Sequence, residues 1–346
     1  MRVYNGAVTR LRTSVLLVAF ALAAGVAAQG QKEASVPTQA LVAVDTNSTA
    51  PITAEALTVT VNDHLHPLLA WQQVEPANAQ VALLLDGGLR ASFGREMVNL
   101  RAFVSSLAPG VEVLIGYMQY GHVVVAQPFT TDHALAASTL HMPEGTSGMS
   151  ASPYTCLTDF LKYWSGSGAV SSATSPVAAA HHKTRYVLMI TDGVDPYNGN
   201  AGVMNQGSPY VDGAITEAQR AGIPIYAIYF GDAGIVGGIA DNSGQTYLSQ
   251  ITQATGGVNY FEGLGNPVST TPYLQLFQSA LAESYIASFN APPAGNGSSR
   301  DLVDVKFDIV KPKKAPKSKS KIKGPKVPAV KTILHAPQRV RPGNVV

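Results

Sequence analysis

Two apolar runs, each followed at once by an acidic residue and a glycine, constrain the fold of this chain most. Residues 81–85 lead into Asp86-Gly87, and residues 186–190 lead into Thr191-Asp192-Gly193. Runs of this length without polar alternation are typical of strands buried on both faces, as in a parallel sheet covered by helices. Ligands of such sheets bind beyond the carboxyl ends of the strands. We therefore expect Asp86 and Asp192 to meet at one site, and a cation site is the first hypothesis.

The stretch from residue 79 to residue 289 alternates between strand patterns and helical patterns. Apolar periodicity of the helical type stops at glycine or proline, for example at Pro109-Gly110, Gly222 and Gly256-Gly257. A short turn at residues 120–122 predicts a hairpin, and a long helix is expected over residues 271–289. This alternation predicts an α/β fold, a doubly wound and mostly parallel sheet with one antiparallel edge strand.

Strand patterns also flank the α/β stretch. Residues 57–78 predict an N-terminal hairpin, in which Pro67 must lie at an edge. Residues 301–346 contain two further strands, over 302–310 and near 330–334. We expect these outer strands to form a small β subdomain from both chain ends, with residues 29–56 as a flexible leader and residues 290–300 as a linker.

The first 28 residues have the organisation of a secretory signal peptide. Arg2, Arg10 and Arg12 precede a short apolar stretch, and Val26-Ala27-Ala28 offers small residues for cleavage. The alternative is an uncleaved membrane anchor. With cleavage, the protein is expected to be secreted, periplasmic or on the cell surface, with no stable membrane span.

Basic residues are concentrated in two stretches and leave an acidic body. Residues 311–326 hold eight lysines and no acid, and residues 1–28 hold three arginines. Removing these eleven from the 24 basic residues leaves 13 against 22 acidic ones. An acidic body argues against nucleic acid as a partner. The lysine segment is read either as a spacer or as a contact for anionic surfaces or acidic protein.

No set of residues in the sequence predicts catalysis. Cys156 is the only cysteine, so disulfides within the chain are excluded, and it is expected in the core. Adjacent residues such as His181 and His182 do not face one another, and His64 and His66 lack a third zinc ligand. No nucleophile, base and orienting residue can be identified together. The chain is therefore not expected to be an enzyme.

The order of these elements, the strand end at Asp86 and the sequence Ile190-Thr191-Asp192-Gly193 together resemble a von Willebrand factor type A (VWA) domain. The resemblance covers roughly residues 79–288. With the export signal and the flanking strands, the chain looks like the secreted bacterial, acidobacterial-type VWFA-related subfamily. The resemblance implies a metal-ion-dependent adhesion site, with a first loop Asp-x-Ser-x-Ser, a threonine in a second loop and an aspartate in a third.

This chain departs from that pattern in the first loop. Gly88 and Arg90 stand where the two serines are expected. In the second loop Ser152 is the nearest match, although Thr146, Ser147, Ser150 and Thr155 are also available. The resemblance implies a ligand-binding surface, here called the top face, at the carboxyl ends of the strands; its residues are Asp86, Gly88, Arg90, Ser152, Asp192 and Asp195.

Two hypotheses for the top face remain open. Arg90 pairs with Asp86 or Asp192 and no cofactor is needed, because a guanidinium satisfies the same carboxylates as a metal. Alternatively, Arg90 points outward and Mg²⁺ or Ca²⁺ binds Asp86, Ser152 and Asp192. A degenerate site of this kind predicts a non-catalytic, extracytoplasmic adhesion module that binds a protein or cell-surface ligand with acidic groups. The alternative is a structural or assembly protein that acts through residues 311–326.

Overall fold

The computed structural model describes residues 35–48, 50–144, 152–164, 183–195, 207–231, 237–261, 268–293, 301–310 and 331–346. Residues Ser35–Val346 form one compact unit. The predicted signal peptide and the lysine segment 311–326 lie outside the described residues. Among the helices that are described, none has both the length and the apolar character needed to cross a bilayer.

The central sheet has six strands and is parallel except at one edge. Its order is β10 (Asn259–Tyr260), β9 (Ile225–Tyr229), β8 (Thr184–Thr191), β5 (Ala79–Asp86), β6 (Glu112–Gln119) and β7 (His122–Thr130). All pairs are parallel except β6 with β7, which form a hairpin. The prediction of a mostly parallel sheet with one antiparallel edge strand is confirmed.

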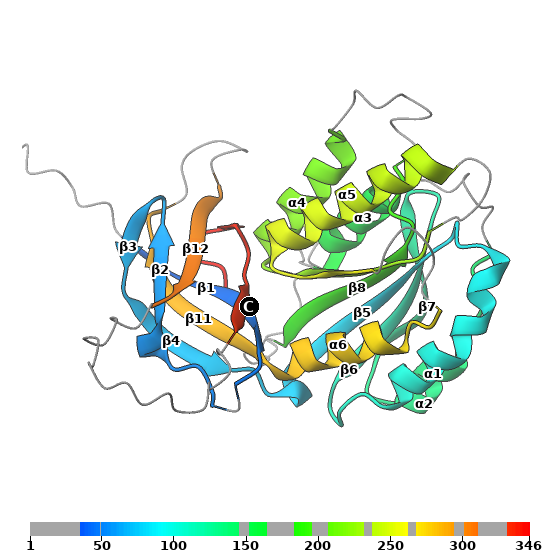
Figure 1. Cartoon of the computed structure of the whole chain (residues 1–346), viewed down its shortest axis with the longest axis horizontal. Helices are drawn as coiled ribbons and strands as arrows, with labels where there is room; N and C mark the ends of the chain where they lie inside the picture. The colour runs from blue at the N-terminus through cyan, green and yellow to red at the C-terminus, as the bar shows by residue number, and fades with distance from the viewer. Residues whose placement is uncertain are drawn as a thin grey trace, which may run out of the picture. The chain divides into compact units, whose positions relative to one another are not determined.

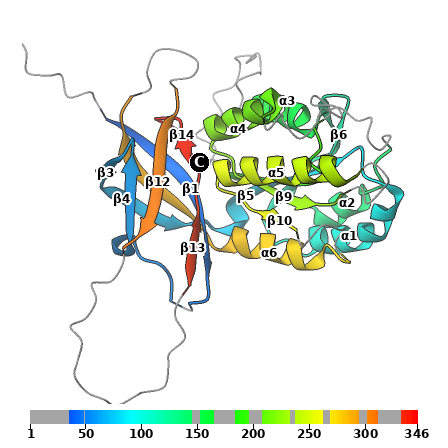
Figure 2. The same cartoon turned by 45° about the horizontal axis from the view of Figure 1, so that its top comes forward.

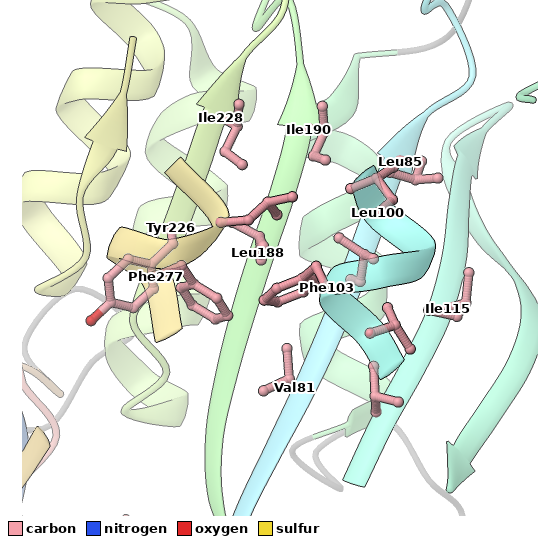
Figure 3. Close-up of a cluster of buried hydrophobic side chains, with 14 of the residues drawn as sticks. Val81, Leu85, Leu100, Phe103, Ile115, Leu188, Ile190, Tyr226, Ile228 and Phe277 are labelled. Carbon is pink, nitrogen blue, oxygen red and sulfur yellow. The ribbon is translucent and has the colours of Figure 1, made fainter. Parts of the chain in front are cut away.

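Helices cover both faces of this sheet (Figure 1). On one face lie α1 (Met97–Ser105), α2 (His133–Ser138) and α6 (Thr271–Ala282); on the other lie α3 (Pro153–Trp164), α4 (Pro209–Ala221) and α5 (Gly237–Thr255). Alternate residues of β5 face opposite layers, because side chains of a strand alternate in direction. Val81 and Leu85 pack against α1, as Figure 3 shows, whereas Leu84 packs on the α3 side.

The remaining strands form two antiparallel sheets that pack face to face, and they can be followed in Figure 2. One sheet has the order β13 (Thr332–His335), β1 (Val36–Thr46), β11 (Ser284–Ala291) and β4 (Leu68–Gln73). The other has the order β14 (Arg339–Val340), β12 (Val303–Ile309), β2 (Leu57–Val61) and β3 (His64–His66). Phe289 and Phe307 meet edge to face between the sheets, with ring centroids 5.9 Å apart. The expected β subdomain from both chain ends is therefore present, and it is a sandwich.

Two expectations for the flanks were wrong. Residues 29–56 are not a flexible leader throughout, because β1 occupies Val36–Thr46 and lies between β11 and β13. The long helix expected over residues 271–289 ends at Ala282, and Ser284–Ala291 is strand β11. Strand β11 of the sandwich thus falls inside the stretch assigned to the α/β part. In both segments, pairing with distant strands decided the structure over a weak local pattern.

Smaller differences concern local structure. The hairpin predicted over residues 57–78 includes only β2 and β3, because after Pro67 the chain continues as β4, which pairs in the other sheet. Helix α1 is preceded by a 3-10 helix, η3 (Ala91–Glu96), and α2 was not predicted. Two short 3-10 turns, η1 (Ala54–Ala56) and η2 (Pro76–Asn78), connect strands. Of the linker 290–300, the first two residues belong to β11 and residues 294–300 lie outside the described part.

Candidate functional site

The carboxyl ends of β5 and β8 lie side by side, which brings the two signature strand ends to one place. Leu85 pairs with Ile190, so the next residues, Asp86 and Thr191, are level across the two strands. The Thr191 hydroxyl donates a hydrogen bond to Asp86 Oδ2 at 2.5 Å, and Gly88 N donates to Asp86 Oδ1 at 2.8 Å. Asp86 is 3% exposed and Thr191 is fully buried. The expected convergence of the two strand ends is therefore present in the structure.

Asp192 begins a tight turn that is held against helix α5. Its Oδ1 accepts a hydrogen bond from Val194 N at 2.9 Å, and the Thr191 hydroxyl oxygen accepts one from Gly193 N at 2.9 Å. Gly193 has a φ of +69°, which favours glycine. Gly244 of α5 approaches so closely that a Cβ there would lie 2.2 Å from the Asp192 carbonyl oxygen. Gly193 and Gly244 thus allow the backbone of this turn to pack closely against α5.

Tyr154 of α3 joins the third loop to the second. Its hydroxyl donates to the Gly193 carbonyl oxygen at 3.0 Å, and the side chain is fully buried. Burial raises the pKa of Tyr154 well above its ordinary value, and the charges of Asp192, Asp195 and Asp86 raise it further. The three carboxylates of the top face therefore all disfavour ionisation of one buried hydroxyl.

Asp195 has a structural role at the start of α4 that the sequence did not predict. Its Oδ2 accepts a hydrogen bond from the Ser208 hydroxyl. Ser208 in turn begins α4, and its side-chain oxygen accepts from Tyr210 N at 3.2 Å. Both side chains are buried. Asp195 thus fixes the start of α4 by holding the serine that caps it.

Ser152 is a buried hydroxyl at the start of α3. Its carbonyl oxygen accepts from Thr155 N and Cys156 N at 3.1 and 3.3 Å, so the residue opens the helix. The side chain is 4% exposed, and its Oγ has no hydrogen-bond partner among the described residues. A buried hydroxyl without a partner costs free energy, commonly about 1–3 kcal/mol. Such an atom is suited to receive a ligand.

Arg90 and Gly88 replace hydroxyl groups on the first loop. Arg90 is half-buried and precedes η3, where its carbonyl oxygen accepts from Phe93 N at 2.9 Å. Gly88 contributes a backbone N–H that is already bonded to Asp86. Residues 86–90 of the first loop therefore contain one guanidinium group, and Asp86 is their only side chain with an oxygen.

A divalent cation fits this donor set in part. Within the described ranges, no three His, Cys, Asp or Glu side chains are grouped to hold a metal ion. Mg²⁺ prefers about six oxygens, and both oxygens of Asp86 already accept hydrogen bonds. The Ser152 hydroxyl supports the fit, because a metal would satisfy it. Asp86, Ser152 and Asp192 are the residues that would hold the ion.

Two functional positions were missed by sequence reasoning, Thr191 and Tyr154. Thr191 carried a signal, since it lies directly between the apolar run and Asp192. Tyr154 carried none, because its contact with Gly193 joins segments 39 residues apart. The alternatives Thr146, Ser147 and Ser150, and the pair His181-His182, lie outside the described residues. The prediction for Cys156 is confirmed, since it is buried and burial raises the pKa of its thiol to about 12.

Comparison with known proteins gives fold-level similarity at low scores. No family model and no curated protein matches this chain. Three similar solved structures are an aerotolerance-related membrane protein from Bacteroides fragilis, proximal thread matrix protein 1 from the mussel byssus and the SpRpn10 VWA domain, with TM-scores of 0.37, 0.37 and 0.35. In the same order, their sequence identities to this chain are 10%, 16% and 9%. The matches cover 59%, 62% and 59% of this chain, and 98%, 48% and 97% of the three similar chains. At these values they assign neither a family nor a function.

Proposed function

We propose that this chain is a non-catalytic binding module of the VWA type, exported from the cytoplasm, that recognises acidic groups of a protein or cell-surface partner through its top face. The observation that carries the proposal is the hydrogen bonding of Asp86 and the residues that follow it in the first loop. Both of its oxygens accept hydrogen bonds from within the fold, and the two positions that should add hydroxyl ligands hold Gly88 and Arg90. The first loop also carries the guanidinium of Arg90, a group that binds carboxylates in a bidentate manner.

The described start of the third loop, residues 191–195, is held in place. Thr191, Gly193 and Tyr154 fix it by hydrogen bonds, and Gly244 packs against its backbone. A surface that is already ordered loses little conformational entropy on binding, which favours recognition. Sites at the carboxyl ends of parallel strands are the usual place for ligands in such sheets.

The test is binding to an array of peptides graded in Asp and Glu content, with the full chain and two charge variants. Arg90→Ala should reduce binding of the acidic peptides at least ten-fold. Lys306→Ala removes the same charge from an exposed site on β12 of the sandwich and should leave binding unchanged. Binding without preference for acidic peptides, or equal binding by Arg90→Ala, would contradict the proposal.

A second candidate is cation-dependent binding, and the partnerless Ser152 hydroxyl favours it. A bound Mg²⁺ or Ca²⁺ would supply a coordination position for an acidic group of the partner. Calorimetric titration with Mg²⁺, Ca²⁺ and Mn²⁺ tests this candidate. Heat of binding that is lost in both Ser152→Ala and Asp192→Asn would establish the cation site; no heat with any of the three ions would leave the guanidinium mode alone.

Export is part of the proposal and has its own test. Cleavage after Ala28 would place Gln29 at the N-terminus of the mature chain. Intact-mass measurement of the protein recovered from the periplasm of an expression host checks this. Recovery of the uncleaved chain in the cytoplasm would contradict it.

A further inference from the structure

A cavity of about 490 Å³ lies at the C-terminal end of α6, away from the top face. Its described lining comes from β1, β4, β10, α6, β11, β13 and the segment 48–52, and includes Asp45, Tyr260, Leu276, Glu283, Tyr285 and His335. Figure 1 shows α6 continuing into β11, so the cavity lies where the chain changes from helix to strand. Its volume suits a small organic molecule. We call it the α6 cavity.

Two aromatic walls of the α6 cavity are held in place by stacking. Tyr285 is 5% exposed and stacks on Trp71, with ring centroids 4.7 Å apart and planes 5° apart. Trp71 in turn donates its indole N–H to the Ile52 carbonyl oxygen at 3.0 Å. Tyr260 is also buried and lies between the rings of Tyr226 and Tyr273. These two rings therefore form fixed apolar walls of the cavity.

The charge around the α6 cavity is negative. Asp45 and Glu283 both line it, and no lysine or arginine is among its described lining residues. Within the described part of the chain, neither carboxylate takes part in a salt bridge. His335 adds no positive charge at neutral pH, because burial lowers its pKa.

The end of α6 adds to this negative potential. The last carbonyl groups of a helix carry partial negative charge, and a cation nearby is favoured. No basic residue lies in the last turn of α6. Ser279, Ala280 and Glu283 of this turn line the cavity directly. The helix end and the two carboxylates therefore both make the potential in the cavity negative and favour a cation there.

We propose that the α6 cavity binds a small organic cation, an ammonium group carried on an apolar chain or ring. Asp45 and Glu283 face the ammonium group, while Tyr260, Tyr285 and Leu276 contact the apolar part. Leu276 is 52% exposed, which is high for a leucine and leaves it available for such a contact.

The chain itself offers the same chemistry. Eight lysines lie between residues 311 and 326, and the structure places Lys331, the first described residue after this segment, near the cavity wall. Lys331 N donates to Asn47 Oδ1 at 2.8 Å, beside Thr46 and Ser48 of the lining. A lysine side chain is an alkylammonium group, so a free amine and a lysine of this segment are two sources for one ligand.

The experiment is calorimetric titration of the full chain with 2-phenylethylamine, and with 2-phenylethanol as the neutral molecule of the same shape. The amine should bind at least ten-fold more tightly than the alcohol. Asp45→Asn and Glu283→Gln should each weaken binding of the amine about ten-fold. Glu75→Gln changes an exposed carboxylate outside the cavity and serves as the matched control, with no expected change.

A variant with the eight lysines of residues 311–326 replaced by glutamine separates the two sources. Tighter amine binding by this variant would show that the chain's own lysines compete for the cavity, and equal binding would identify a free cation as the ligand. Absence of amine binding in both the wild-type chain and this variant would overturn the proposal. Equal affinity for the alcohol, or unchanged amine binding in Asp45→Asn and Glu283→Gln, would also overturn it.

Discussion

The hydroxyl of Thr191 donates a hydrogen bond of 2.5 Å to Asp86 Oδ2 across two neighbouring strands whose residues are 105 positions apart in sequence. The same hydroxyl oxygen accepts from Gly193 N, so one side chain orders both signature strand ends. This bond links the first and third loops of the top face. It is also the contact most open to test by substitution.

Replacement Thr191→Val keeps the shape of the side chain and removes both hydrogen bonds. Asp86 is buried, so a carboxylate oxygen loses its partner, and we expect a loss of about 1–3 kcal/mol in the free energy of unfolding. Urea unfolding followed by circular dichroism measures it. Thr216→Val is the control, because its hydroxyl bonds only a carbonyl of its own helix at 2.8 Å, and it should change stability by less than about 0.5 kcal/mol. Equal losses of unfolding free energy in the two variants would show that the Thr191 hydrogen bonds stabilise the fold no more than the hydrogen bond of Thr216.

Two glycines in helices should respond to alanine with opposite signs. Gly244→Ala places a Cβ 2.2 Å from the Asp192 carbonyl oxygen, so α5 must move, and we expect a loss of at least about 2 kcal/mol. Gly213→Ala in α4 meets nothing within 4 Å, so the higher helix propensity of alanine should stabilise the protein by about 0.5–1 kcal/mol. Thermal unfolding of the two variants compares them. A stabilised Gly244→Ala would contradict the close packing of α5 on the third loop.

The thiol of Cys156 should be unreactive in the folded protein. It is buried, and burial raises its pKa from 9.0 to about 12, so almost no thiolate forms at pH 8. Labelling with a thiol reagent at pH 8 should proceed only after denaturant is added. The neutral thiol contributes its full stability below pH 9, and this contribution is lost as the pH rises from about 9 to about 12. Rapid labelling of the native chain would show that the helix around Cys156 opens readily.

Arg220 and Asp301 should show measurable coupling. Arg220 Nε lies 2.6 Å from Asp301 Oδ2 and Nη2 lies 3.2 Å from Oδ1, which is a bidentate pair that ties α4 to the residues before β12. The two side chains are 25% and 21% exposed, so screening is incomplete and we expect a coupling energy of about 1 kcal/mol. A double-mutant cycle with Arg220→Ala and Asp301→Asn measures it. The exposed pair Lys306–Asp308 is the control and should show almost none.

The pH dependence of this pair follows from the pKa of Asp301. The hydrogen bond from Arg220 lowers that pKa below its ordinary value of 3.8. The pair therefore stabilises the fold fully above about pH 4, and its contribution is lost as the pH falls below 3.8. Stability that does not differ between wild type and Asp301→Asn at pH 6, yet differs at pH 3, would contradict this sign.

Much of the central sheet was predictable because its signals are local. The buried runs, the hairpin and the capped helices each occupy one short stretch, as Gly222 shows by ending α4 in the left-handed conformation predicted for glycine. The sandwich was less predictable. In the pairing of β1 with β11, Val36 lies opposite Ala291 and Ala43 lies opposite Ser284. No local sequence pattern indicates a pairing partner so far away in the chain. Pairing energy between distant strands outweighed weak local propensity there.

The sequence alone determined that two carboxylates end two buried parallel strands and that Gly88 and Arg90 stand where hydroxyls would complete a cation site. Those conclusions need only strand direction and residue chemistry. The tertiary structure decided which atoms satisfy those carboxylates, that Ser152 is buried without a described partner, and that a cavity with acidic walls lies at the end of α6. Hydrogen bonds and cavities depend on side chains from distant segments reaching one point in space, and only the folded packing fixes those distances.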